Sequence, residues 1–520
     1  MGPHGSEAVS PVGSGEKGLL LGVDIGTYES KGLLVEPNGC LVASHAVPHE
    51  LLLPRQGWAE HDAESVWWGD LCTLTKALLA QSRRDPKDIL AVGCSSIAPD
   101  MLPVDDAGLP LRNAVLYGID TRAQAEIREL EERIGGRTIF DRTGNALSAQ
   151  SVGPKILWLA RNEPEVYWRT RRFVTGTTFL VGRLTGRWVV DHYTASCMGP
   201  FYDPSKGAWA EDLCSGIVET GRLPEIVWTA QIAGGVTREA ARATGLAEGT
   251  PVIAGTADAA AEAVSVGVVA SGRAMLMYGS TMFYIQVTDA PLRDLRLWSA
   301  PYLFPGTHAM MGGMATTGAL TRWFRDQLAR DEGRGGDAYA RLAEGAASVP
   351  PGAEGLLALP YFSGERTPIN DPLARGVFFG LTLSHTREHL YRAVLEGVGH
   401  GIRQHLDLLE SLGHPPRRLM AVGGGTKNRP WLQMVSDISG RAQTVPSVTW
   451  GAAYGDAFLA GMGAGLFREP AEADRWVEDR ETVCPDPGLK VYYDRCHELY
   501  LELYERNREL MHALSSLARS

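Results

Sequence analysis

The strongest constraint on the fold is a strand–turn–strand pattern at residues 19–36, LLLGVDIGTYESKGLLVE. Residues 19–23 are apolar and short enough for a buried strand, residues 26–27 form a Gly-Thr turn, and residues 31–35 run back as the partner strand. Asp24 therefore ends a buried strand beside a turn with free backbone N–H groups. This arrangement suits a metal ion bound to a nucleotide phosphate, although an ordinary hairpin with a turn aspartate has the same pattern.

Residues 273–287, RAMLMYGSTMFYIQV, repeat this plan in the second half of the chain. A β-rich run leads to Gly279-Ser280-Thr281, and another β-rich run follows. Two strand–turn–strand units of one kind predict a duplicated α/β architecture. Each half would then present one phosphate-binding loop to a cleft between the halves.

The composition is that of a globular protein with more than one domain. At 520 residues the chain is too long for a single core, and its hydrophobic content of 44% and charged content of 21% are ordinary. A net charge of −11 argues against a nucleic-acid partner, and no apolar run is long enough to cross a membrane. The seven scattered cysteines form no CxxC pair, so we expect reduced thiols and a cytoplasmic location.

The two ends of the chain have distinct patterns. Residues 1–17 are rich in Gly, Ser and Pro and lack an apolar core, which indicates a disordered leader or an expression tail and not a signal peptide. The C-terminal residues form a charged helix with an apolar stripe, which we expect to dock on the body of the protein. The stripe consists of Tyr492, Cys496, Leu499, Leu503, Leu510, Leu514 and Leu517.

Candidate substrate-binding residues follow a buried strand at residues 89–94. Pockets in open α/β sheets lie beyond the carboxyl ends of strands, so residues 95–100 are a candidate substrate loop. Its last residue, Asp100, could hold a substrate hydroxyl group or could equally be a solvated turn aspartate. Further along, Asp120 is expected to cap a helix at residues 121–134.

Residues 250–261, TPVIAGTADAAA, place a second carboxylate at the end of a strand. Residues 251–254 form the strand, Gly255 and Thr256 turn, and Asp258 begins a helix of small residues. Such a helix lets a ligand or another helix approach closely. From this stretch alone, Asp258 is either a catalytic group or a helix-capping aspartate.

The second half continues the alternation of strands and helices. We predict a Gly-rich turn and a following helix from residue 310, and a long amphipathic helix at residues 387–409. A strand at residues 419–422 runs directly into GGGTKN at residues 423–428, and glycines between a strand and a helix let backbone lie against a flat or anionic ligand. Residues 451–466 form a small-residue helix.

Six stretches together resemble the FGGY carbohydrate kinases of the actin–hexokinase fold, and most closely their xylulokinase-like branch. The two longest stretches are highly specific. The matching segments are DIGTYESKG (24–32), YGIDTR (117–122), GTADAAAEAVSVG (255–267), YGST (278–281), YFSGERTPINDPLARGVFFGL (361–381) and VGGGTKNRPWLQMVSDISG (422–440).

The resemblance implies an α/β fold with two actin-like (ribonuclease H-like) domains around a central cleft that holds ATP and a sugar. Residues 18–266 would form the N-terminal domain, on the sugar and Mg²⁺–phosphate side. Residues 267–485 would form the C-terminal domain, on the nucleotide side. Residues 486–520 would form the C-terminal helix, and a homodimer is possible.

The resemblance also assigns roles to individual residues. Asp258 matches the catalytic base, and Asp24 together with Asp258 is placed at the Mg²⁺ ion. The residues assigned to ATP are Thr27, Lys31, Gly279, Ser280, Thr281, Gly318, Gly424, Gly425, Thr426 and Asn428. The residues assigned to the sugar are Asp100, Tyr117, Asp120, Arg122 and Asp258.

The sequence departs from the xylulokinase pattern on the sugar side. Ala98-Pro99-Asp100 replaces a Met-His-Gly sequence, Ala259 follows the base where asparagine is common, and Gly118 replaces an aromatic residue. We expect ATP-dependent phosphorylation of a primary hydroxyl group of a neutral sugar, a pentulose such as xylulose. The alternatives are a kinase for another ketose or polyol (ribulose, glycerol or a tetritol), or a non-catalytic actin-like nucleotide-binding regulator.

Overall fold

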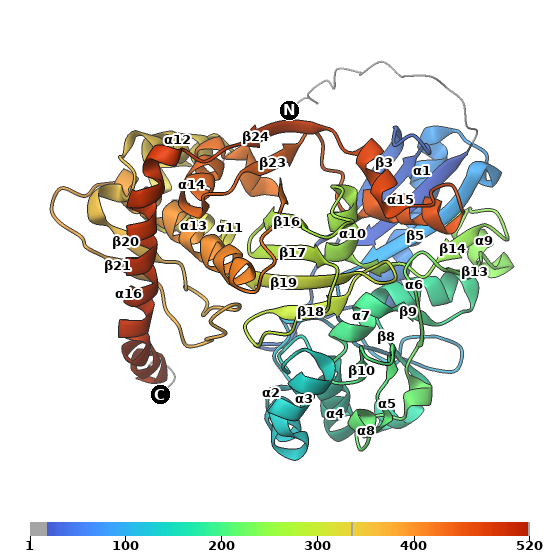
Figure 1. Cartoon of the computed structure of the whole chain (residues 1–520). Coiled ribbons are helices and arrows are strands. Elements are labelled where there is room, and N and C mark those ends of the chain that lie inside the picture. Colours follow the sequence, from blue (N-terminus) through green and yellow to red (C-terminus); the bar gives the residue numbers. More distant parts are fainter. Residues whose placement is uncertain (1–17, 334–335, 518–520) are drawn as a thin grey trace. The chain divides into compact units, whose positions relative to one another are not determined.

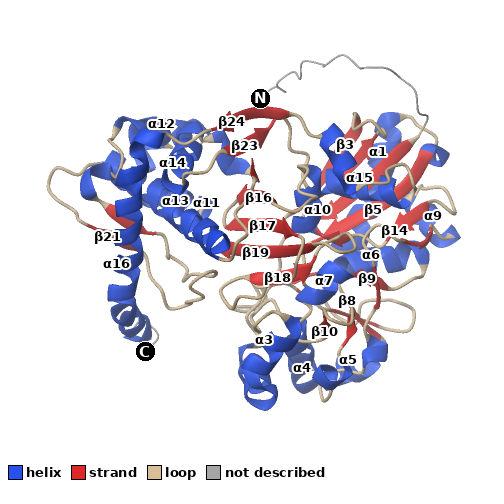
Figure 2. Ribbon diagram, viewed as in Figure 1, coloured by secondary structure: helices blue, strands red, loops and turns tan. Residues whose placement is uncertain are grey.

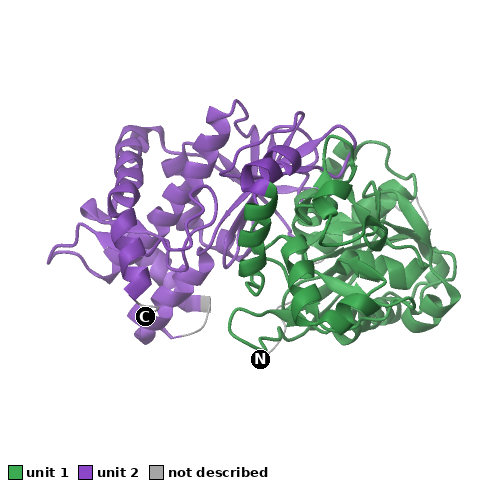
Figure 3. Cartoon of the chain, turned by 90° about the horizontal axis from the view of Figure 1, so that it is seen from below, with its two compact units in different colours: residues 1–134, 147–265, 450–476 green, residues 135–146, 266–449, 477–520 purple. Residues whose placement is uncertain are grey.

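The computed structural model describes residues 18–333 and 336–517, so the predicted leader at residues 1–17 lies outside the described residues. The chain divides into two units (Figure 3). Unit 1 holds the described residues of 1–134, 147–265 and 450–476, and unit 2 holds those of 135–146, 266–449 and 477–520. The predicted domain boundary at residue 266 stays a prediction. The units differ from it in that residues 450–476, from the second half of the sequence, pack with unit 1.

Unit 1 is built on a seven-stranded mixed sheet (Figure 1). Its strand order is β13-β14-β5-β1-β2-β3, and β15 also pairs with β5. The pairs β1–β2 and β2–β3 are antiparallel, whereas β5 runs parallel to both β1 and β14. The elements of the unit are β1 (Leu19–Ile25), β2 (Glu29–Val35), β3 (Leu41–Pro48), β4 (Glu60–His61), α1 (Gly69–Ser82), β5 (Ile89–Ser96), β6 (Leu102–Val104), β7 (Ala114–Val115), α2 (Gln124–Leu130), α4 (Val152–Asn162), α5 (Pro164–Arg169), β8 (Arg172–Val174), α6 (Gly176–Thr185), β9 (Val189–Asp191), α7 (His192–Cys197), β10 (Tyr202–Asp203), β11 (Ala208–Trp209), α8 (Glu211–Cys214), β12 (Glu225–Val227), β13 (Ile232–Gly235), α9 (Arg238–Thr244), β14 (Pro251–Ile253), β15 (Thr256–Ala257), α10 (Asp258–Ser265) and α15 (Ala452–Gly463).

Unit 2 repeats this topology around a second seven-stranded sheet, with order β18-β19-β17-β16-β22-β23-β24 (Figure 2). Again three strands form an antiparallel meander, β16-β17-β19, and two more, β22 and β23, continue the sheet in parallel with β16. The predicted duplication is therefore confirmed. The elements of this unit are α3 (Gly136–Thr143), β16 (Arg273–Tyr278), β17 (Met282–Thr288), β18 (Trp298–Pro301), β19 (His308–Met314), α11 (Gly318–Leu328), α12 (Gly336–Ser348), β20 (Leu357–Leu359), β21 (Val377–Phe379), α13 (Arg387–Ser411), β22 (Arg418–Val422), α14 (Arg429–Ser439), β23 (Gln443–Pro446), β24 (Asp479–Val483) and α16 (Lys490–Leu517).

Two glycines let α15 lie very close to the sheet of unit 1. Gly22 of β1 and Gly93 of β5 are register partners and point to the same face of the sheet. A Cβ atom at Gly22 would lie 1.8 Å from the carbonyl oxygen of Ala453, and one at Gly93 would lie 2.2 Å from that of Asp456. Both oxygens belong to α15, so any larger residue at either strand position would push this helix away.

A third glycine brings α10 against α15 in the same way. A Cβ atom at Gly455 would lie 1.9 Å from the carbonyl oxygen of Ala261 in α10. Helix α1 covers the opposite face of the sheet at Gly32, where an added Cβ atom would lie 2.9 Å from a leucine side chain of that helix. The first residue of α10 is Asp258, so the close contact between α10 and α15 fixes where that carboxylate stands relative to the sheet.

Two predicted elements of the first and second halves are wrong in detail. The expected Gly-rich turn after residue 310 is the end of strand β19, where Gly312 and Gly313 leave room for neighbours: a Cβ atom at Gly313 would lie 2.6 Å from the carbonyl oxygen of Met282. These glycines serve close packing and not a turn. The helix expected at residues 121–134 begins only at Gln124, in α2.

The predicted docking stripe on the C-terminal helix is correct at Leu503, which is 6% exposed, and wrong toward its end. Leu510, Leu514 and Leu517 are 63%, 64% and 71% exposed. The buried face of α16 carries mainly tyrosines, with Tyr500 hydrogen-bonded to Tyr361 and Tyr504 to Asp371, and continues to Ser515. No helix of the described residues is both long and apolar enough to cross a membrane.

Replacing Gly93 by alanine is expected to destabilise unit 1, because the new methyl group would overlap backbone of α15 that has no room to retreat. Overpacking of this kind costs roughly 1–3 kcal/mol. Thermal melting measures the effect. Gly221→Ala is the control, since no atom lies within 4 Å of a Cβ atom at that position. Equal melting temperatures for the two variants would contradict the close approach.

Candidate functional site

The turn after β1 is held by histidines. The N–H of Gly26 donates to the carbonyl oxygen of Glu29 (3.1 Å), so this predicted free donor is already used. His49 bonds through Nε2 to the Gly26 carbonyl oxygen, and His61 to that of Thr27, both at 3.1 Å. The Gly-Thr turn therefore has a fixed backbone.

Asp24 is the second-to-last residue of strand β1, and Lys31 is its register partner on β2. The Lys31 side chain is about half exposed and forms an ion pair with Glu29 (3.3 Å). The Asp24 carboxylate accepts a hydrogen bond from the hydroxyl group of Ser95 on β5 (2.9 Å). Burial raises the pKa of Asp24 to about 6, although the Ser95 hydrogen bond and Lys31 both act in the opposite direction.

Asp258 begins α10, and its Oδ1 accepts from the N–H of Ala259 (2.7 Å). Burial and the negative charges of Asp24, Glu262 and Asp100 raise the pKa of Asp258 well above its usual value. The two carboxylates that the sequence places at strand ends are thus brought together within unit 1. Each makes ionisation of the other harder.

The strand before Asp258 is anchored through Thr256. Its hydroxyl donates to the buried carboxylate of Asp191 (2.7 Å), and its carbonyl oxygen accepts from the hydroxyl of Thr177 (2.8 Å). Thr229 donates to the same Asp191 oxygen (2.9 Å). This network holds β15, and with it the start of α10, in one position.

Glu262 was missed by the sequence reasoning. It stands one turn after Asp258 on α10, and burial together with Asp24 raises its pKa to about 7. The available signal was the spacing, because carboxylates four residues apart on a helix share a face.

These carboxylates fit a magnesium ion that is held mainly by water and phosphate. Mg²⁺ takes oxygen ligands and commonly uses only one or two protein carboxylates. Among the described residues no group of three or more His, Cys, Asp or Glu side chains forms a metal cage. Asp24 is close enough to Asp258 to raise the pKa of that carboxyl group, and a cation beside the two would relieve the repulsion.

Asp100 is completely buried, so its interpretation as a solvated turn residue is wrong. Oδ1 accepts from the N–H of Gly176 (3.0 Å), whereas Oδ2 has no hydrogen-bond partner among the described residues. Burial raises the pKa of Asp100 to about 7, and Lys155 acts against this rise. A buried carboxylate oxygen without a donor is suited to receive one from a ligand.

Lys155 is a second residue that the sequence reasoning did not select. Its ammonium group is buried and donates to the carbonyl oxygens of Leu116 (2.5 Å) and Tyr117 (3.2 Å). Burial lowers its pKa to about 7. Through this contact Lys155 holds the segment whose Tyr117 hydroxyl bonds to Thr27 (3.1 Å), so a predicted sugar residue and a predicted phosphate residue lie side by side.

Asp120 and Arg122 are engaged with each other. Arg122 contacts the Asp120 carboxylate through Nε (3.0 Å) and Nη2 (2.7 Å), and both side chains are fully buried. The guanidinium group of Arg122 lies 4.0 Å from the ring centre of Trp58 and 5.1 Å from that of Trp158. Asp120 accepts from the N–H of Ala59 (2.7 Å) and caps no helix. Their assignment to the sugar stays a prediction, but the contacts that the structure records are internal.

The predicted nucleotide residues come together in unit 2. Strands β16 and β22 are parallel, so the loops that follow them lie at one edge of the sheet. The first residues of α11 fix the first loop: the N–H of Gly318 donates to the carbonyl oxygen of Gly279 and that of Ala319 to Ser280, both at 3.0 Å. Thr281 closes this loop by accepting from the Gly279 N–H (3.1 Å).

The glycine loop after β22 packs against the end of β16. Gly423 adopts a φ of +90°, and a Cβ atom there would lie 2.8 Å from the carbonyl oxygen of Tyr278. Gly424, by contrast, has no neighbouring atom within 4 Å of an added Cβ atom, so its backbone stands open. Thr426 bonds back to Gly423, and Asn428 caps α14 through the N–H of Trp431 (3.1 Å).

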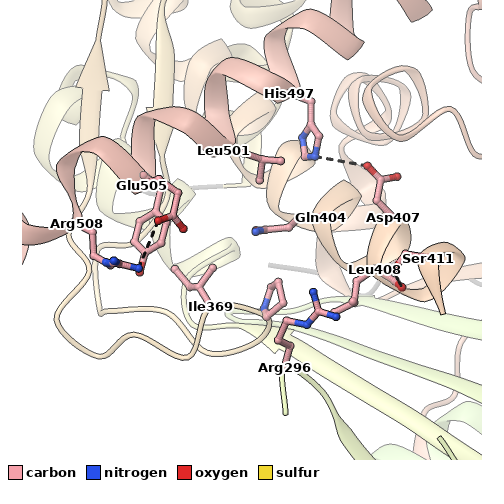
Figure 4. A pocket seen from close by; sticks show the side chains of 12 residues that line it. Arg296, Ile369, Gln404, Asp407, Leu408, Ser411, His497, Leu501, Glu505 and Arg508 are labelled. Carbon is pink, nitrogen blue, oxygen red and sulfur yellow. Dashed lines mark hydrogen bonds and ion pairs between the residues drawn. The ribbon is translucent and has the colours of Figure 1, made fainter. Parts of the chain in front are cut away.

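Unit 2 also holds a cavity of about 480 Å³ between α13 and α16, which contains none of the predicted site residues (Figure 4). Charged side chains on its lining have partners: Arg508 pairs with Glu505 (3.4 Å), Asp407 with Arg403 (3.2 Å) and Arg296 with Asp294 (2.7 Å). His497 lies 3.6 Å from Asp407, but burial lowers its pKa to about 4, so its ring is neutral at pH 7. The lining charges of this cavity are therefore matched by neighbouring side chains.

Comparisons with known proteins identify relatives along the whole chain. Family models described as the FGGY family of carbohydrate kinases match it, the N-terminal domain at residues 19–265 and the C-terminal domain at residues 274–464. The xylulose kinase of Escherichia coli (strain K12) is 31% identical over 500 residues, which are 95% of this chain and 100% of the relative. A gluconokinase of Bacillus subtilis (strain 168) is 29% identical over 436 residues, which are 82% of this chain and 84% of the relative.

The crystal structure of xylulose kinase from Rhodospirillum rubrum has the same fold. It superposes with a TM-score of 0.89 at 33% sequence identity and covers 95% of this chain and 100% of that chain. The predicted α/β fold with two actin-like domains is therefore confirmed.

Arg122→Lys is expected to destabilise the protein, because a lysine cannot reproduce the forked contact with Asp120 or the stacking between two tryptophans. Hydrogen bonds to charged groups contribute about 1.5–3 kcal/mol each, and we expect a loss of this order. Thermal melting measures it. The matched control is Arg238→Lys, whose exposed ion pair with Glu248 should contribute little. If Arg122→Lys melts like the wild type but binds sugar poorly, Arg122 belongs to the sugar site.

Proposed function

The chain belongs to the FGGY family of carbohydrate kinases and phosphorylates a sugar with ATP, and we propose that the acceptor is a primary hydroxyl group of a neutral pentulose such as xylulose. Two observations support this acceptor. Relatives named xylulose kinase extend over 95% of the chain. Asp100, the last residue of the candidate substrate loop, carries a buried oxygen that has no donor among the described residues.

We assign Asp258 as the catalytic base, and this carboxylate is the observation that carries the proposal. In the transfer the sugar oxygen bonds to the γ-phosphorus, the bond to the β-phosphate oxygen breaks, and ADP leaves. The hydroxyl proton must go to an acceptor. Asp258 stands at the start of α10 with its pKa raised, and a base of raised pKa accepts a proton more readily once it is ionised.

A magnesium ion, if held by Asp24 and Asp258, would neutralise charge on the phosphates and lower the pKa of both carboxylates. Asp24 suits this position because it is partly exposed at the end of β1 and is oriented by Ser95. Thr27 and Lys31 supply a hydroxyl group and a positive charge in the adjoining hairpin, and we assign both to the phosphates.

We assign the nucleotide to the loops of unit 2. Gly279, Ser280 and Thr281 form a loop whose backbone α11 holds in place, and such fixed loops suit phosphate groups. The open backbone of Gly424 is the part of the second loop that a flat or anionic group can approach. The proposed ATP residues of unit 2 are Gly279, Ser280, Thr281, Gly318, Gly424, Gly425, Thr426 and Asn428.

Three finer expectations stay open proposals. The acceptor could be another ketose or a polyol, and the chain could form a homodimer. A cytoplasmic location is supported by seven cysteines that are all free thiols.

The regulator without catalytic activity is disfavoured, because the carboxylates needed for the transfer are all present in unit 1.

Coupled detection of ADP tests the proposal over a panel of xylulose, ribulose, glycerol, erythritol and gluconate. We expect the highest kcat/KM for a pentulose. Absence of ADP release with every acceptor would favour the regulator, and gluconate as the preferred acceptor would overturn the argument from Asp100.

Asp258→Asn is expected to lower kcat by about 10²–10⁴-fold, which is the usual contribution of a general base, and to leave the Kd for ATP nearly unchanged. Steady-state kinetics and calorimetric ATP titration measure the two quantities. Glu248→Gln, an exposed carboxylate of the same unit, is the control and should retain wild-type kcat. More than about a tenth of wild-type kcat in Asp258→Asn would remove this residue from the role of base.

Asp100→Asn is expected to raise the use of gluconate relative to xylulose by roughly tenfold, equivalent to 1.4 kcal/mol, while the KM for ATP stays constant. The pKa of Asp100 is raised to about 7, so its carboxyl group is neutral below pH 7 and charged above it. Wild-type discrimination against gluconate should therefore grow as the pH rises through 7, and that of Asp100→Asn should not. An unchanged acceptor ranking would place Asp100 outside the sugar site.

A further inference from the structure

A buried acid lies behind Asp24. Asp456, on α15, has no exposed surface, and its Oδ2 lies 2.6 Å from the hydroxyl oxygen of Ser95 on β5. The same hydroxyl oxygen lies 2.9 Å from Oδ1 of Asp24 on β1. Three residues from three elements of unit 1 thus form one chain of hydrogen bonds, Asp456–Ser95–Asp24.

The number of hydrogens in this chain decides its direction. A serine hydroxyl group has one hydrogen and can donate it to only one of the two carboxyl groups. Both O···O distances, 2.6 Å to Asp456 and 2.9 Å to Asp24, are those of O–H···O hydrogen bonds, so each contact needs its own hydrogen. The carboxyl group that does not receive the serine hydrogen must therefore itself be protonated and donate to Ser95.

The proton belongs on Asp456. Asp456 has no exposed surface, and its second oxygen has no hydrogen-bond partner among the described residues, so an ionised carboxylate there would keep one buried oxygen unmatched. Asp24 is less enclosed and has Lys31 as a nearby positive charge. Ser95 therefore receives from Asp456 and donates to Asp24.

We propose that Asp456 is a positioning residue: as a neutral acid it donates to Ser95 and so turns the Ser95 hydroxyl toward Asp24, which is thereby held in one orientation. The consequence for Mg²⁺ rests on the proposed function of Asp24. The hydrogen-bond direction itself does not, because it follows from the three side chains alone.

Replacing Asp456 by asparagine distinguishes a role as hydrogen-bond donor from a role that needs a negative charge. In Asp456→Asn the side-chain NH₂ group can donate to Ser95 as the acid does, so the chain is kept. In Asp456→Ala the donor is lost, and in Ser95→Ala the chain is cut in the middle. A matched contrast is Asp191, which is equally buried but only accepts, from Thr229, Thr256 and the N–H of Thr194. Asn is expected to be harmful there.

The first test measures kcat against Mg²⁺ concentration in the full-length variants. We expect Asp456→Asn to stay within about threefold of the wild-type Mg²⁺ requirement, and Asp456→Ala and Ser95→Ala to need 10–100-fold more, as is typical when a residue behind a metal ligand is removed. If Asp456→Asn is as impaired as Asp456→Ala, the negative charge of Asp456 is what matters and the proposal is wrong. A wild-type requirement in Asp456→Ala would also overturn it.

The second test needs neither metal nor substrate. The infrared difference spectrum between wild type and Asp456→Asn, both free of ligand at pH 7, should show the C=O stretch of one protonated carboxyl group in the wild type only. Absence of this band means that Asp456 is ionised and contradicts the proposal, even if Asp456→Ala fails to fold. If the band is present but the wild type phosphorylates no sugar, the proposed function fails and the hydrogen-bond chain stands.

Discussion

The close contact between α15 and the sheet of unit 1 is the constraint on which the rest of the site depends. Glycines at positions 22 and 93 leave no room for a Cβ atom between strand and helix, and Gly455 brings α10 equally close to α15. Because backbone packs on backbone there, a short side chain such as Asp456 can reach Ser95 across the interface. Larger residues at these glycines would separate the groups that must interact.

The electrostatic result of this packing is a concentration of acidic groups. Asp24, Asp258, Glu262 and Asp456 all have raised pKa values, and burial is the largest cause for each. Such grouping is unfavourable in the free protein and becomes favourable when a cation and a proton-bearing substrate arrive. Sites with strongly perturbed pKa values are commonly functional for this reason. In our proposal the residues whose burial is costly on folding are the same ones that carry out the transfer.

Much of the fold followed from the sequence, because strand–turn–strand patterns and Gly-rich strand ends are local signals. The predictions that failed concern residues whose environment is set by packing against distant parts of the chain. The glycines at 312 and 313 look like a turn but lie in a strand, and the last three leucines of the predicted α16 stripe stay exposed while tyrosines and Leu503 dock. Asp456 was missed because its role exists only once α15 lies on β5; its one local sign was a carboxylate in an otherwise small and apolar helix.

We propose that this protein moves a phosphate from ATP to a primary hydroxyl group of a sugar. The most direct measurement is NMR of the product formed from ATP and xylulose, with the phosphorus–carbon couplings assigned. We expect one phosphate per ADP, attached to a terminal carbon of the sugar. ADP with free phosphate and unchanged sugar, or a phosphate on a secondary hydroxyl group, would contradict it.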